Sequence, residues 1–143
     1  MAVGEFVKTN PAAPQGFFAA EAAGLRWLAV PSGVRVASVV GHTATSLTLQ
    51  RLNGTAPSRS AARDFGVRLA VTHDAGAPSF GAGPDGWAGP GYFGPLSQPL
   101  PMSLHGHRSW GRFYAEERLR PMAALRRTAR AGHRRHPQTA AVA

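Results

Sequence analysis

The chain contains a single lysine, Lys8, and an acidic residue downstream, Glu21, that could neutralise it. Lys8 closes the apolar run of Phe6 and Val7, which is typical of the end of a strand. Glu21 falls in a predicted helix, where it shares one arc, roughly 80° wide at about 100° per residue, with apolar residues. These apolar residues are Phe18, Leu25 and Leu28. A carboxylate on an apolar face is unfavourable unless a cation meets it. Lys8 is the nearest candidate, and an ammonium group held in this way can bind phosphate groups.

An ordinary interpretation of these two residues is also open. Glu21 would then lie at the edge of the apolar stripe and reach water, and Lys8 would be a surface residue. Short patterns of this kind often arise by chance, so the two residues taken alone favour this interpretation. The elements around them must decide.

The elements that would position the pair are a strand, a helix and a hairpin. Asn10, Pro11 and Pro14 interrupt the chain after Lys8, and a helical pattern begins near Gln15. Residues 34–40 are rich in β-branched side chains and predict a second strand, which Gly41 and His42 would end in a turn. Residues 46–50 alternate between polar and apolar side chains and predict a third strand that completes a hairpin.

A further helix is predicted to begin at Ser58 or Ser60, either of which could cap it. Its expected inner face includes His73, which we interpret as a core histidine without a catalytic role. The other residues of that face are Ala62, Phe65, Gly66 and Leu69. Residues 76–101 are dense in glycine and proline and predict a loop pinned by aromatic side chains, namely Phe80, Trp87, Tyr92 and Phe93.

Two motifs in the second half of the chain match functional patterns only in part. Residues 81–86 fit the dinucleotide-binding glycine pattern, but no strand precedes them, no helix follows, and Pro84 lies inside. His105 and His107 resemble a metal-binding pair, but with no nearby carboxylate we expect a weak site. A helix is predicted from Trp110, which Pro121 should end or kink.

Composition limits the class of protein. The 143 residues form one domain at most, or a piece of one, and without cysteine there is neither a disulfide nor a thiolate metal site. No stretch resembles a signal peptide or is apolar enough to cross a membrane, which predicts a cytoplasmic protein. Of the net charge of +9, residues 112–135 supply +6 through eight arginines and two glutamates. The basic character therefore belongs to one terminal segment.

Four segments, in this order, resemble the fructosamine kinase (ketoamine kinase) family. They are residues 6–10 (FVKTN), 18–25 (FAAEAAGL), 66–73 (GVRLAVTH) and 110–119 (WGRFYAEERL). No single segment is decisive, but the ordered set is fairly specific and extends from about residue 6 to about residue 127.

The resemblance implies an α+β chain that is a fragment of a protein-kinase-like fold. Residues 1–52 would form part of the N-lobe, with a strand, a helix, a hairpin and the hinge. Residues 53–127 would begin the C-lobe with a helix, the Gly/Pro-rich loop and another helix, and residues 128–143 are predicted to form a basic disordered tail. ATP and Mg²⁺ are the implied cofactors, with Lys8 and Glu21 as the phosphate-positioning pair. Backbone groups near Gln50 and Leu52 would meet the adenine ring.

The resemblance further implies an enzyme that phosphorylates a sugar hydroxyl of ketoamine adducts on proteins or small amines. Phosphoryl transfer also needs a loop over the phosphates, a carboxylate that orients the acceptor, and Mg²⁺ ligands. Only seven residues precede Lys8, and the segment around His107 has a histidine where the family's His-Gly-Asp loop has its acid. We therefore predict no catalytic or metal-binding residues here and a truncated chain that is inactive alone and does not bind ATP tightly.

Two alternatives to a kinase fragment remain open, and both concern binding. The arginine-rich residues 112–135 could contact nucleic acid or another polyanion, although the tail beyond Arg127 lacks interleaved aromatic residues for stacking on bases, which makes a nucleic-acid partner unlikely. A pseudokinase-like interaction protein could instead self-associate through the open sheet edge expected at the lysine strand.

Overall fold

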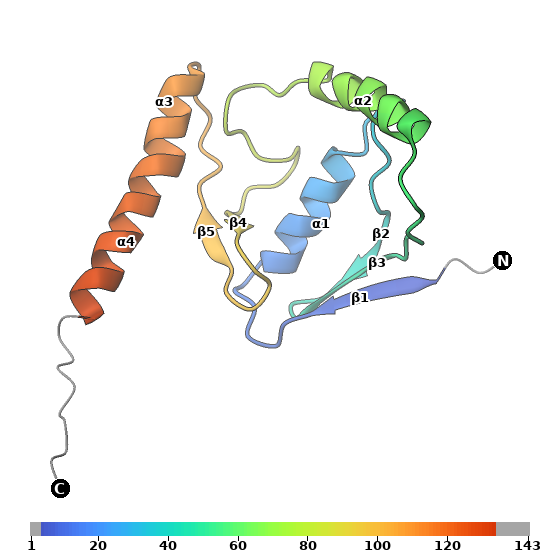
Figure 1. Cartoon of the computed structure of the whole chain (residues 1–143). Coiled ribbons are helices and arrows are strands. Elements are labelled where there is room, and N and C mark those ends of the chain that lie inside the picture. The colour runs from blue at the N-terminus through green and yellow to red at the C-terminus, as the bar shows by residue number, and fades with distance from the viewer. Residues whose placement is uncertain (1–3, 134–143) are drawn as a thin grey trace, which may run out of the picture.

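A small sheet and one helix form the core of the chain in the computed structural model, which describes residues 4–133 (Figure 1). The sheet contains β1 (Glu5–Thr9), β2 (Val39–His42) and β3 (Ser46–Gln50). All pairings are antiparallel and the strand order is β1-β3-β2, so β3 is central and β1 forms one edge. The mixture of helix and sheet agrees with the predicted α+β class, and β3 lies where its alternating pattern placed it.

Helix α1 (Phe17–Trp27) covers one face of this sheet. The alternation in β3 decides which face, because Leu47 and Leu49 are buried while Thr48 between them points to the other side. Phe18 is 1% exposed and packs into the same cluster. The buried core consists of Phe17, Phe18, Ala22, Leu47 and Leu49. One helix against three short strands is therefore the main source of stability.

The hairpin forms as expected, but its first strand lies later in the sequence than predicted. Strand β2 begins only at Val39 and continues through Gly41 and His42, where the sequence predicts a turn. The turn lies at residues 43–45, where the Thr43 side chain accepts a hydrogen bond from the backbone of Thr45. Before β2, the backbone N–H of Val34 donates to the Thr72 hydroxyl at 3.0 Å, so this stretch is tied to a helix instead of the sheet.

Helix α2 (Arg59–Asp74) begins where predicted, with the Ser58 hydroxyl accepting a hydrogen bond from the backbone N–H of Ala61. Within the described chain, however, α2 buries none of its side chains. The predicted inner face is therefore wrong, and His73 is exposed instead of lying in a core. The helix meets the rest of the chain near Gly33, where an added Cβ would lie 2.5 Å from the Thr72 hydroxyl oxygen.

The Gly/Pro-rich segment, predicted as a loop, contains a short antiparallel pair formed by β4 (Gly91–Phe93) and β5 (Leu100–Met102). Strand β4 packs against α1. The Tyr92 hydroxyl donates to the backbone oxygen of Gln15 at 2.9 Å, and the Tyr92 ring meets Phe17 edge-on at 5.3 Å. The aromatic residues thus fix this segment to the core helix, as the sequence suggested for Tyr92.

The C-terminal helix comprises α3 (Trp110–Tyr114), a π-helical turn η1 (Ala115–Leu119) and α4 (Arg120–His133). Pro121 does not end it, because the wider π turn comes directly before the proline. Pro121 has no N–H for the Glu117 carbonyl oxygen, and the Arg118 guanidinium donates to that oxygen instead, at 2.9 Å. The helix reaches His133, so the predicted disordered tail is wrong for residues 128–133; residues 134–143 lie outside the described part.

This helix stands apart from α1 and the sheet and docks on the segments around β4 and β5 (Figure 1). Gly81, with φ of 89°, allows the approach, because an added Cβ would lie 2.5 Å from the Phe113 ring and 2.7 Å from a backbone oxygen. Phe80 and His107 form an isolated antiparallel bridge beside it. Among residues 4–133, no helix has the length and apolar character needed to span a membrane.

Candidate functional site

The sole lysine and the helical glutamate meet. Lys8 Nζ donates to Glu21 Oε1 at 2.6 Å, and the two side chains are 27% and 29% exposed. Register explains the contact, because Lys8 lies opposite the buried Leu47 in the β1–β3 ladder and so shares the sheet face that α1 covers. The structure confirms the predicted ion pair.

The turn between β1 and α1 sets the distance between the two charges. The Asn10 side-chain oxygen accepts a hydrogen bond from the backbone N–H of Ala12, which turns the chain immediately after the strand. The side-chain nitrogen of Asn10 donates to the backbone oxygen of Leu96, which also joins this turn to the segment between β4 and β5. Gly16, with φ of 81°, lies at the N-cap of α1, and Glu21 follows one turn after Phe17.

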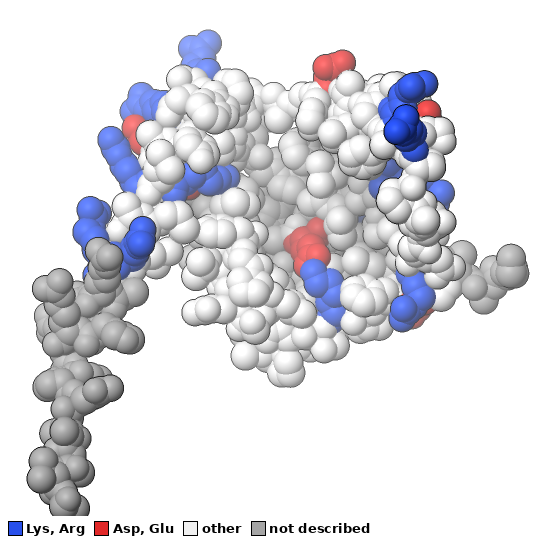
Figure 2. Space-filling view, viewed as in Figure 1, with Lys and Arg blue, Asp and Glu red and all other residues white. Residues whose placement is uncertain are grey.

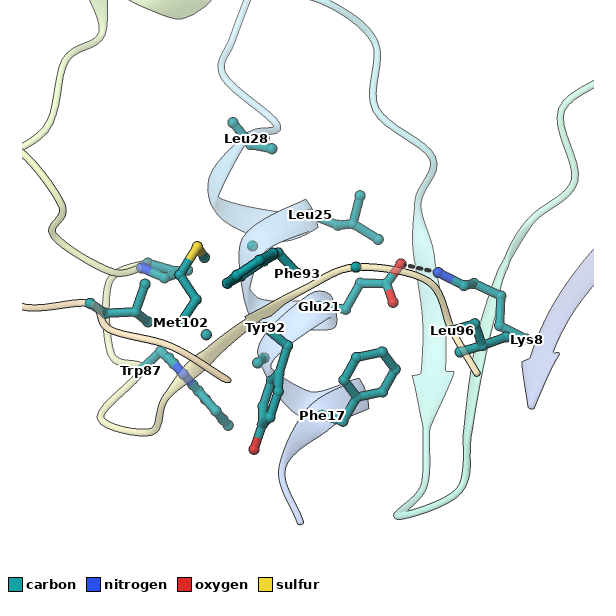
Figure 3. A pocket seen from close by; sticks show the side chains of 16 residues that line it. Lys8, Phe17, Glu21, Leu25, Leu28, Trp87, Tyr92, Phe93, Leu96 and Met102 are labelled. Atoms are coloured by element: carbon teal, nitrogen blue, oxygen red, sulfur yellow. Dashed lines mark hydrogen bonds and ion pairs between the residues drawn. The ribbon is translucent and has the colours of Figure 1, made fainter. Parts of the chain in front are cut away.

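A cavity of about 420 Å³ lies beside the ion pair (Figure 3). Its wall on one side is α1, and on the other side it is the segment around β4 and β5. Lys8 and Glu21 are the charged residues among the described side chains that line it. Large apolar side chains make up much of the remainder, namely Phe17, Leu25, Trp87, Tyr92, Phe93 and Met102. An ion pair at the edge of an apolar cavity can hold an ammonium group toward an anionic ligand.

The predicted adenine-binding positions lie elsewhere. Gln50 ends β3 opposite Glu5, and Leu52 is 61% exposed beyond it. The backbone N–H of Gln50 donates to the oxygen of Ser38, just before β2, at 2.8 Å, so this N–H already has a partner within the chain. Neither residue lines the cavity beside Lys8. The structure brings Lys8 and Glu21 together and leaves the roles of Gln50 and Leu52 as predictions.

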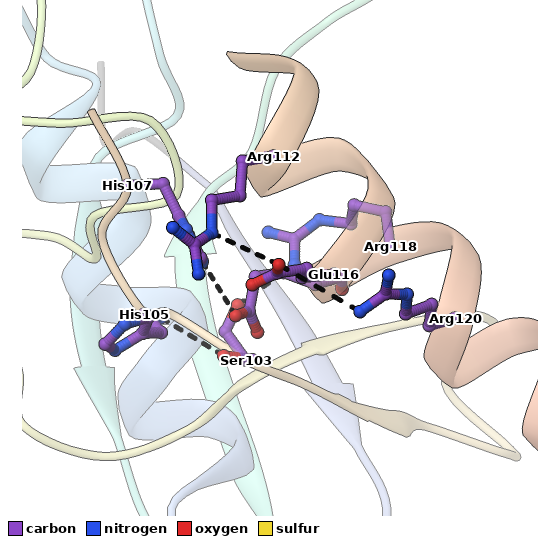
Figure 4. A network of polar contacts seen from close by, with 8 residues as sticks. Ser103, His105, His107, Arg112, Glu116, Arg118 and Arg120 are labelled. Atoms are coloured by element: carbon purple, nitrogen blue, oxygen red, sulfur yellow. Dashed lines mark hydrogen bonds and ion pairs between the residues drawn. The ribbon is translucent and has the colours of Figure 1, made fainter. Parts of the chain in front are cut away.

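A second polar site, which the sequence did not reveal, surrounds His107 (Figure 4). His107 Nε2 lies 2.8 Å from Glu117 Oε1, so the expectation that no carboxylate lies near this histidine is wrong. A hydrogen bond from the Ser103 hydroxyl, followed by that from His107, holds the pKa of Glu117 below its ordinary value. Helical spacing from Trp110 could not show this contact, because His107 belongs to the segment before the helix.

Arginine side chains gather over α3 and α4 (Figure 2). Several of these arginines bind protein atoms. Arg112 Nε donates to Glu116 at 3.1 Å, and Arg118 donates to the Ser103 oxygen at 3.0 Å and stacks over the Phe113 ring. Part of the basic segment that we considered for polyanion binding therefore serves to hold the helix in place.

Comparison with known proteins gives one consistent result. The family model described as fructosamine kinase matches residues 3–142. A candidate ketoamine kinase of Synechocystis sp. (strain ATCC 27184 / PCC 6803 / Kazusa) is 33% identical over 132 residues, which is 90% of this chain and 42% of that protein. The crystal structure of a candidate fructosamine-3-kinase from Thermobifida fusca YX-ER1 is similar with a TM-score of 0.69 and 41% identity, over 90% of this chain and 42% of that one. The chain thus spans less than half the length of these relatives.

Proposed function

Because the chain belongs to the fructosamine kinase family, we propose that it forms part of an enzyme that transfers the γ-phosphate of ATP to a sugar hydroxyl of a ketoamine adduct. The adduct would be a fructosamine or ribulosamine on a protein or a small amine. The observation that carries this proposal is the 2.6 Å contact between Lys8 and Glu21 at the edge of the cavity. A glutamate that holds a strand lysine is what phosphate positioning requires in kinases.

In this proposal each named residue has a physical role. Glu21 holds the Lys8 ammonium group in place, and Lys8 binds phosphate oxygens and stabilises the charge that develops on them. Gln50 and Leu52 would contact adenine through their backbones, so residues 1–52 would act as the N-lobe part and residues 53–127 as the start of the C-lobe.

The bound ATP would come with Mg²⁺, which needs carboxylate or amide ligands. Glu21 is the carboxylate among the described residues that line the cavity, and it is already paired with Lys8. We therefore assign the Mg²⁺ ligands and the acceptor-orienting carboxylate to the part of the family sequence that this chain does not cover. It follows that the 143-residue chain transfers no phosphate by itself.

The binding alternatives have less support than the kinase assignment. A polyanion that used Arg118 would have to displace it from the Ser103 backbone oxygen and from the Phe113 ring. A pseudokinase-like interaction protein would keep the cavity beside Lys8 but would transfer no phosphate. The activity of a completed enzyme would distinguish a fragment of an active kinase from a pseudokinase-like interaction protein.

A chimera tests the proposed reaction. Residues 4–104 replace the corresponding residues of the full-length Synechocystis relative, and the purified protein is given Mg-ATP and a fructosamine of Nα-blocked lysine. We expect ADP formation that depends on the ketoamine, whereas the 143-residue chain alone produces none. A folded chimera without activity, beside an active parent enzyme, would contradict the proposal, and turnover by the chain alone would contradict the assignment of the missing groups.

We further propose that the 143-residue chain self-associates through β1. In the described chain β1 pairs with β3 along one edge, and Val7 is 52% exposed. Backbone hydrogen bonds from Asn10 to Thr45 and from Arg51 to Gly4 show which residues of β1 form hydrogen-bonded pairs with β3. Because such pairs alternate with non-hydrogen-bonded ones, the N–H of Val7 points away from β3. A free edge of this kind can pair with a second copy.

Sedimentation velocity over a hundredfold concentration range would test this association. We expect dimers that weaken when Val7→Pro removes the outward N–H, and that persist with Val7→Thr, which keeps it. A chain that is monomeric at every concentration, or dimers that Val7→Pro leaves unchanged, would contradict association through β1.

A further inference from the structure

We propose that His107, Glu116 and Glu117 form a binding site for a divalent transition-metal ion, expected to be zinc, which fastens the C-terminal helix to the segment after β5. One ligand atom from each of the three side chains lies within 4.8 Å of the others. Imidazole and carboxylate groups are a common donor set for zinc. This site is separate from the cavity beside Lys8 and is not part of the proposed phosphate chemistry.

The site is sheltered but open to an ion. The side chain of His107 is 8% exposed and that of Glu117 is 16% exposed. A surface depression of about 550 Å³ borders all three ligands, together with His105. The His105 ring meets that of His107 edge-on with centroids 4.9 Å apart. An ion can therefore reach the ligands from solvent without unfolding of the helix.

The π-helical turn explains how two consecutive glutamates serve one site. Neighbouring side chains diverge by about 100° around an α-helix, which would point Glu116 and Glu117 in different directions. The wider turn of η1 reduces this divergence. Such turns occur frequently at functional sites. Here the π turn also relieves the clash that the Pro121 ring would otherwise make with the carbonyl group of Glu117. The proline in the sequence therefore favours the π turn.

The charges around the site allow a cation to bind. Glu116 contacts Arg112 and Arg120 at 3.1 and 4.0 Å, but these arginine side chains are 70% and 75% exposed. Exposed ion pairs contribute little to stability, so either arginine can move into solvent when a metal ion binds.

Only small side-chain movements are needed. Ligand atoms at roughly 2.0–2.2 Å from a tetrahedral zinc ion lie about 3.4 Å from one another. The His107–Glu117 distance of 2.8 Å would widen, and the longer separations within the 4.8 Å group would close. A fourth position remains for water or for His105. The nitrogen ligand disfavours Mg²⁺, which prefers oxygen ligands in octahedral geometry.

Metal binding would have a structural effect. Among the described residues, the contacts that hold the C-terminal helix to the body include the packing of Phe113 at Gly81, the Arg118–Ser103 hydrogen bond and the His107–Glu117 contact. A metal that joins His107 to the two glutamates would link the helix to the preceding segment directly. Ligands that bind the folded state stabilise it.

Zinc titration of the full chain tests the proposal. His133 and His136 are first replaced by alanine, because they could bind metal independently of the site. With a chromophoric zinc indicator as competitor, we expect one equivalent to bind with a Kd of about 1–10 µM, weaker than four-ligand structural sites. Excess Mg²⁺ should not compete. Co²⁺ bound in place of zinc should give the visible absorption bands of a low-symmetry coordination site.

Variants assign the ligands. Glu116→Gln changes an exposed contact and should fold normally, yet weaken zinc binding at least about tenfold, since even outer-shell partners of a metal cost 10–100-fold. His107→Ala should abolish binding of the one equivalent. His42→Ala, which removes a histidine on β2 far from the site, is the matched control and should bind as the parent does. Zinc binding that is absent, or that Glu116→Gln leaves unchanged, would overturn the site.

Discussion

Replacing Phe18 with alanine should lower the free energy of unfolding by about 3–5 kcal/mol. Phe18 is 1% exposed and is one of the two largest fully buried side chains, with its ring 4.9 Å from that of Phe17 in an edge-on contact. Among the described residues the core cluster has five buried members, so loss of the Phe18 ring removes a large share of its apolar packing. Small domains have about 5–15 kcal/mol of stability in total. The variant should therefore lose a large share of its stability and unfold at a much lower urea concentration, which urea titration followed by circular dichroism would measure.

Phe65→Ala is the matched control, because it makes the same chemical change on α2. Phe65 is 53% exposed, and within the described chain α2 buries no side chain. The stability should change by no more than about 0.5 kcal/mol. If the two variants were equally destabilised, the core would not lie between α1 and the sheet.

This contrast between Phe18 and Phe65 marks how far the sequence could predict the fold. Helical spacing identified both as members of an apolar face. The alternation in β3 indicates what the face with Phe18 packs against, because Leu47 and Leu49 must be covered. Nothing in the spacing of α2 indicates whether another element covers it, so its face and His73 were wrongly assigned to a core.

The two polar sites differ in the same way. The Lys8–Glu21 pair could be predicted because a carboxylate on an apolar face requires a cation and the chain has one lysine. The His107–Glu117 contact could not, because it depends on the π turn before Pro121 and on the close approach at Gly81. Both are tertiary effects. The proline pattern predicted an end or a kink at Pro121, and the helix instead passes through a π turn and continues to His133.

In the chimera that carries residues 4–104, Lys8→Met should lower kcat by about 10²–10³-fold, the effect expected for loss of one group that stabilises transition-state charge. Glu21→Gln should cause a smaller loss, because Lys8 keeps its charge but loses the partner at 2.6 Å that orients it. Arg26→Met is the matched control: it removes a positive charge at the exposed end of α1 and should leave kcat unchanged.

Stability can be separated from catalysis in this experiment. The Lys8 and Glu21 side chains are 27% and 29% exposed, so solvent screens the pair and its removal should change the free energy of unfolding by no more than about 1 kcal/mol. Melting temperatures measured beside the rates would verify this. Lys8→Met with parental activity would show that the pair only joins strand to helix. A large loss of kcat in a protein that melts normally is what phosphate positioning requires, since the lysine then acts on the reacting group and not on the fold.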